Sequence, residues 1–217
     1  LGALVDGAIL TGSTAAIESL ELSFRVIIFF AFCGAFCGAF LTPTMVYLFQ
    51  KAIVRFEQTG SIPAVFLSVF YPKNFIKILK SFRLPRVSSL KSLRWKSLPK
   101  QFLVINICVT SIYVIGVLCS LFAGASLPEF RSTAIQLSGI VNGIATVLFT
   151  IFVDPPGARV TDQVITGQRD EAELRSVVFF LQCGKMLGIL ILAQLIFKPM
   201  TYYIMYVTSL ISQSVIL

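Results

Sequence analysis

Residues 102–123 read FLVINICVTSIYVIGVLCSLFA, a run of 22 residues without a charged side chain. A helix needs roughly 20 mostly apolar residues to cross the hydrocarbon core of a bilayer, so this run predicts a membrane-spanning helix. The whole chain has the same character, since 56% of its 217 residues are hydrophobic, 13% are charged and the mean hydropathy is +0.87. A soluble domain carries about 25% charged residues. The sequence therefore predicts an all-α polytopic membrane protein rather than a soluble enzyme.

Four stretches are long and apolar enough to span, and they cover residues 24–48, 102–123, 134–153 and 177–197. The apolar tail Met200–Leu217 follows Lys198-Pro199, and proline inside a helix removes a hydrogen bond and clashes with the preceding turn. We expect the helix to end there, with the tail in the interface or turning partly back; a fifth span is the alternative. The chain starts at Leu1 rather than Met, and we expect residues 1–217 to be a single membrane domain within a longer protein.

The positive charges predict the orientation of the spans, because cytoplasmic loops are rich in Lys and Arg. Residues 51–100 contain 11 of the 18 Lys and Arg residues, and Glu57 is the only acid among them. Residues 154–176 add Arg159, Arg169 and Arg175, whereas the opposite side holds Arg25, Arg131 and Lys198. We expect the basic loop 51–100 and the loop 154–176 to be cytoplasmic, and both ends of this chain to face outward.

The basic loop contains an amphipathic stretch, residues 73–82, between Pro72 and Pro85. One interpretation is an anchor on anionic phospholipid headgroups. The other is a surface that gathers an anionic lipid headgroup, and its candidate residues are Lys73, Lys77, Lys80, Arg83 and Arg86.

Polar residues inside the spans are the other candidates for function, since charges at membrane depth are costly. Lys185 is the only charged residue well inside a span, and Gln182 lies three positions before it on the same helix face. Lys185 either snorkels or pairs with an acid elsewhere, or it meets a phosphate in a cavity.

Two further polar rows occur at helical spacing. Asn142, Thr146 and Thr150 share a face of the third span, with Gln136 near its outer end, and Asn106 and Thr110 share a face of the second. Such residues either hydrogen-bond neighbouring helices or contact a substrate. The predicted substrate-binding set is Lys185, Gln182, Asn142, Thr146 and Asn106.

Several chemistries lack their usual residues. The chain has no histidine, and its five cysteines lie in apolar runs that favour packing. It has no glycine-rich phosphate loop, and its predicted spans contain no Asp or Glu. The net charge of +8 is concentrated beside apolar spans, which favours a membrane surface over nucleic acid. We predict no catalytic residue, metal site or cofactor.

Several sequence blocks resemble one family, the Amj-type alternate lipid II flippases of bacteria. They occur in the family's order over nearly the whole chain, and no single block is a catalytic signature. The blocks are Arg25-Val26-Ile27-Ile28, Leu41-Thr42-Pro43-Thr44, Leu48-Phe49-Gln50-Lys51-Ala52-Ile53, Gly60-Ser61-Ile62-Pro63, Leu98-Pro99-Lys100, Tyr113-Val114-Ile115-Gly116-Val117-Leu118, Val141-Asn142-Gly143-Ile144-Ala145-Thr146, Val153-Asp154-Pro155, Thr161-Asp162 and Leu192-Ala193-Gln194-Leu195.

The resemblance implies a six-span protein of which this chain matches the last four spans. It also implies a flippase that moves lipid II, the undecaprenyl-pyrophosphate-linked peptidoglycan precursor, across the bacterial cytoplasmic membrane for cell-wall synthesis. The expected partners are then lipid II and anionic phospholipids. A scaffold that recruits partners through its basic loop is the alternative, as is a small-solute permease or channel.

Overall fold

The computed structural model describes residues 1–61, 63, 82 and 100–216, and every secondary-structure element within them is helical. Within these residues, four helical stretches are long and apolar enough to cross a membrane, as the sequence predicts. The chain forms two compact units, one of Leu1–Cys33 with Leu93–Leu217 and one of Gly34–Ser92. The long helix α2 (Thr14–Thr59) belongs to both units, because it passes from the first into the second.

Helix α5 (Lys100–Ser126) is the centre of the larger unit. It packs against α1 (Gly2–Thr11), α6 (Arg131–Phe152), α8 (Glu171–Leu187) and α9 (Ala193–Ile216). In the most apolar 18-residue stretch of α5, 50% of the residues are buried. The corresponding stretch of Pro128–Ile165, which contains α6, is 17% buried. At 1.5 Å per residue, α5 is about 40 Å long, which is enough to cross the hydrocarbon core.

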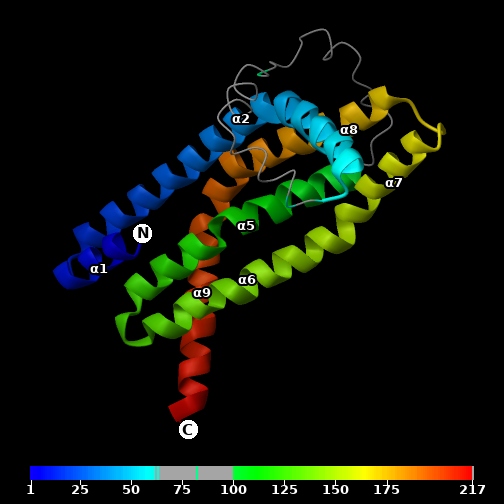
Figure 1. The fold of residues 1–217 in the computed structure, drawn as a ribbon. Coiled ribbons are helices and arrows are strands. Elements are labelled where there is room, and N and C mark those ends of the chain that lie inside the picture. The colour runs from blue at the N-terminus through cyan, green and yellow to red at the C-terminus, as the bar shows by residue number, and fades with distance from the viewer. Residues whose placement is uncertain (62, 64–81, 83–99, 217) are drawn as a thin grey trace. The chain divides into compact units, whose positions relative to one another are not determined.

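Figure 1 shows α6 returning beside α5 after a tight connection, the short 3-10 helix η3 (Pro128–Phe130). The two helices are therefore antiparallel neighbours. Helices α8 and α9 together run parallel to α5. Asn106 contacts Leu181 near the start of α5, and Cys119 contacts Phe197 further along it. This arrangement leaves α5 between α6 on one side and α8 on the other.

The segment 154–176, predicted as the connection between the third and fourth spans, is mostly helical. Helix α7 spans Asp154–Ile165 and α8 already begins at Glu171. Pro155 suits the first turn of α7, where a missing N–H costs nothing. Buried Val153, Val160 and Val177 pack with Phe102 in one apolar cluster, which holds α7 against the ends of its neighbours.

The predicted helix end at Pro199 is wrong, because α9 continues through Pro199 to Ile216. Side chains on both sides of the proline are buried, with Phe197 at 0% and Ile204 at 1% exposure. Neighbouring helices let membrane helices tolerate proline, and this packing keeps the tail helical. A π-helical turn, η4 (Gly188–Leu192), joins α8 to α9.

The basic loop predicted for residues 51–100 is only partly described by the structure. The first nine residues of the basic loop, 51–59, lie in α2 rather than in a loop. The amphipathic stretch 73–82 and the cations Lys73, Lys77, Lys80, Arg83 and Arg86 lie outside the described residues, apart from Phe82.

Candidate functional site

A close approach between α5 and α6 occurs near the middle of both helices. The side chain of Asn142 lies directly against Gly116, so that a Cβ added to Gly116 would overlap the Asn142 amide oxygen and would also press on Val141, at 3.3 Å. Glycine on α5 therefore makes room for the polar side chain on α6. Within the described residues, the Asn142 Oδ1 atom is buried and has no hydrogen-bond partner.

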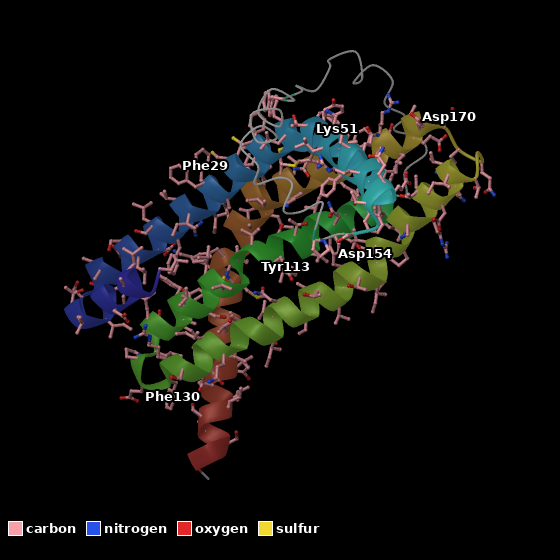
Figure 2. The ribbon with its side chains drawn as sticks, viewed as in Figure 1. Phe29, Lys51, Tyr113, Phe130, Asp154 and Asp170 are labelled. Carbon is pink, nitrogen blue, oxygen red and sulfur yellow. The ribbon has the colours of Figure 1, made fainter. Side chains whose placement is uncertain are left out.

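One helical turn from Asn142 is a second polar contact between the same helices. The hydroxyls of Tyr113 and Thr146 are 3.0 Å apart, and the Thr146 hydroxyl also donates to the carbonyl of Asn142 at 2.8 Å. Tyr113, labelled in Figure 2, is 48% exposed, and Thr146 is exposed as well. These hydroxyls lie at mid-span on the outside of the helix pair.

The polar face of α6 extends in both directions from Thr146. Gln136 and Thr150 are exposed, and no atom of the described residues lies within 4 Å of a Cβ placed on Gly139 or Gly143. We call this surface the open face, defined by Gln136, Gly139, Gly143, Thr146 and Thr150 of α6 with Tyr113 of α5.

Asn106, another predicted site residue, has a different environment. It is 4% exposed, and its amide nitrogen donates to the carbonyl of Leu181 in α8 at 3.0 Å. The hydroxyl of Ser111 donates to the carbonyl of Gly188 at 2.9 Å. We call this contact the closed seam, defined by Asn106, Ile107 and Ser111 of α5 with Leu181, Gly184 and Gly188 of α8 and η4.

The remaining predicted pair, Lys185 and Gln182, lies on α8. The Lys185 side chain is exposed and Gln182 is half-buried. No ion pair joins Lys185 to any acid among the described residues. The structure thus brings Asn142 and Thr146 together on α6, places Asn106 in the closed seam, and leaves Lys185 on a third helix.

A charged cluster between α2 and α9 was missed by the sequence analysis. Glu21 contacts the Arg25 guanidinium at 2.9 Å and the Lys198 ammonium at 3.2 Å. Arg25 also donates to the Gln194 carbonyl at 3.0 Å, and the Gln194 amide donates to the Arg25 carbonyl at 2.9 Å. The Glu21–Arg25 spacing of four was a visible signal, but the partners on α9 were not.

A hollow in the smaller unit is lined by Tyr47, Gln50, Lys51 and Val54. The Lys51 ammonium lies 4.6 Å from the centroid of the Tyr47 ring, and Figure 2 labels Lys51 on α2. Across the described residues, no three His, Cys, Asp or Glu side chains come together as metal ligands.

These features define a polytopic α-helical membrane protein with hydrogen-bonding groups at mid-span. More particularly, the chain belongs to the Amj family, described as Alternate to MurJ, whose family model matches residues 1–208. The chain is 38% identical over 208 residues to the lipid II flippase Amj of Bacillus subtilis strain 168, across 95% of this chain and 76% of that protein. No solved structure matches the chain. The family resemblance of the sequence blocks is therefore confirmed.

Proposed function

We propose that this protein is a lipid II flippase, which moves the undecaprenyl-pyrophosphate-linked peptidoglycan precursor across the bacterial cytoplasmic membrane. The observation that carries this proposal is the 38% identity to a lipid II flippase over 95% of the chain. The family blocks at Tyr113–Leu118 and Val141–Thr146 also converge, since the Tyr113 hydroxyl meets Thr146 and Gly116 meets Asn142.

The physical task is to move a polar headgroup across about 30 Å of hydrocarbon while the lipid tail stays in the bilayer. Polar groups at mid-span lower the cost of that passage, because they replace some of the water that the headgroup loses. Tyr113 and Thr146 offer such groups at the middle of two spanning helices.

In this proposal the basic loop 51–100 and the segment 154–176 are cytoplasmic, and both ends of the chain face outward. The excess of Lys and Arg in these two segments supports that orientation. The cations of the basic loop gather anionic headgroups at the inner surface. Lys185 is a further substrate contact, supported by its lack of an acidic partner among the described residues.

The test is complementation in bacteria depleted of their own lipid II flippase. The full-length protein is expressed, and the lipid II that reacts with an externally added probe is counted. Restored growth together with restored external lipid II supports the proposal. A protein that inserts correctly but leaves lipid II inside contradicts it.

A further inference from the structure

The open face of α6 has an unusual composition for a surface that lipid tails would cover. With 3.6 residues per turn, Gln136, Gly139, Gly143, Thr146 and Thr150 recur on one side of the helix. The adjacent row, Ile140, Ile144 and Ile151, is also exposed but wholly aliphatic, at 60%, 57% and 58%. One helix therefore presents two exposed rows of opposite polarity at the same depths.

The hydrogen bonds on this face do not account for its polarity. The Thr146 hydroxyl donates a hydrogen bond to the Asn142 carbonyl of its own helix. The Tyr113 hydroxyl of α5 contacts the same Thr146 hydroxyl. The side chains of Gln136 and Thr150 are exposed, and neither makes a hydrogen bond to another described residue. A polar side chain facing hydrocarbon without a partner is costly, so water or a polar ligand is the natural occupant.

The chemistry of the open face fits an anionic and hydroxyl-rich ligand. Amide and hydroxyl groups both donate hydrogen bonds, and residues 132–152 contain no Asp or Glu that would repel a phosphate. The two glycines leave space beside the donors, because a Cβ on either would touch no atom of the described residues. The buried Asn142 oxygen, which has no hydrogen-bond partner in the described part of the chain, borders the row from the α5 side.

We infer that the open face is the wall of a hydrated groove that holds the sugar and pyrophosphate headgroup of the transported lipid during its passage. This inference rests on the proposed function and deepens it, since it assigns the headgroup route to the α5–α6 face. Tyr113 and Thr146 form the mid-span contact, with Thr150 on one side of them and Gln136 on the other. The aliphatic row faces the lipid tails.

The experiment compares the two rows by their access to water. In the full-length protein with its native cysteines replaced, single changes are made in the polar row (Gln136→Cys, Thr146→Cys, Thr150→Cys) and in the aliphatic row (Ile140→Cys, Ile144→Cys, Ile151→Cys). Each variant in native membranes is treated with a charged maleimide, with and without added lipid II. Because the thiolate that reacts forms only where water reaches the sulfur, the polar row should react at least about tenfold faster than the aliphatic row.

Added lipid II should slow the reaction of the polar row and leave the aliphatic row unchanged. Equal reactivity of the two rows would overturn the groove, and a fast polar row that lipid II does not protect would overturn the headgroup assignment. Both results are independent of the complementation assay. If complementation restores external lipid II but both rows are equally unreactive toward the maleimide, the proposed function stands and only the headgroup route along the open face is rejected.

Discussion

The two sides of α5 use the same kinds of residue for opposite purposes. On the side of α8, the polar side chains of the closed seam are hydrogen-bonded to the neighbouring helix: Asn106 donates to the Leu181 carbonyl and Ser111 to the Gly188 carbonyl. On the side of α6, the open face keeps Tyr113 and Thr146 exposed and leaves the Asn142 oxygen without a partner among the described residues. Hydroxyls and glycines thus serve as helix–helix contacts in one place and as an accessible polar surface in the other.

The glycines show the same contrast in steric terms. A Cβ on Gly188 would lie 2.8 Å from the backbone oxygen of Ile107, whereas a Cβ on Gly143 would meet no atom of the described residues within 4 Å. A glycine pair therefore does not by itself indicate helix packing. What distinguishes the two sides is whether a neighbouring backbone occupies the space.

The largest effect is expected for Gly188→Leu in the closed seam. The new side chain meets the α5 backbone, which cannot move aside, so overpacking should cost about 1–3 kcal/mol or more. Thermal unfolding of the purified protein in detergent measures this loss. The matched control is Gly143→Leu, which should unfold at nearly the wild-type temperature. Similar losses for both would remove the steric contrast between the two sides.

Gly116→Ala should have the next largest effect on stability, because its Cβ overlaps the Asn142 amide oxygen. We expect a cost of about 1–3 kcal/mol, most of which the second change Asn142→Ala should recover. A double-mutant cycle on unfolding temperatures measures the coupling between the two positions. Additive losses would mean that the two side chains do not meet.

The two asparagines should separate stability from transport. Asn106→Leu removes a buried interhelical hydrogen bond and should cost about 0.6–1.7 kcal/mol through a weaker closed seam. Asn142→Leu removes a buried oxygen without a partner among the described residues, so its stability should stay near that of the wild type while flipping falls. The paired measurements are unfolding temperature and lipid II translocation at equal protein amounts. A larger loss of stability for Asn142→Leu than for Asn106→Leu would contradict the contrast between the closed seam and the open face.

Tyr113→Phe should have the smallest effect on the fold. It deletes one exposed hydroxyl that faces Thr146, and hydrogen bonds between membrane helices contribute about 0.6 kcal/mol on average. Translocation should fall by a few-fold, since a mid-span donor is lost. Val117→Ala, at another exposed position of α5, is the control and should leave translocation unchanged.

The sequence predicted the helical class and the spans well, because both depend on the run length of apolar residues. It also found the polar rows on the second and third spans. It could not tell that Asn106 would be buried and Thr146 exposed. Helical spacing shows which residues share a face of a helix, but it does not show which other helix packs against that face. The same limit hid the contact of Arg25 with Gln194, which are 169 residues apart.

The helical course of α9 through Pro199 and the helix in 154–176 have a common physical origin. Pro199 was expected to end a helix on the basis of its missing N–H and its ring, but burial of Phe197 and Ile204 outweighs that preference. Residues 154–176 were predicted only as the connection between two spans, yet Val160 and Val177 join a buried cluster with Phe102. In both segments, tertiary packing decides what local propensity leaves undecided.

The most direct test of the central claim is the rate of lipid II translocation in proteoliposomes containing the full-length protein with Thr146→Val. Valine keeps the shape of threonine but removes the exposed mid-span hydroxyl. The control is Thr208→Val, at a position that is 0% exposed, where the hydroxyl donates only within α9. We predict a several-fold slower rate for Thr146→Val with a nearly unchanged unfolding temperature, and a wild-type rate for Thr208→Val. Wild-type translocation by Thr146→Val would contradict the claim that the headgroup passes along the open face.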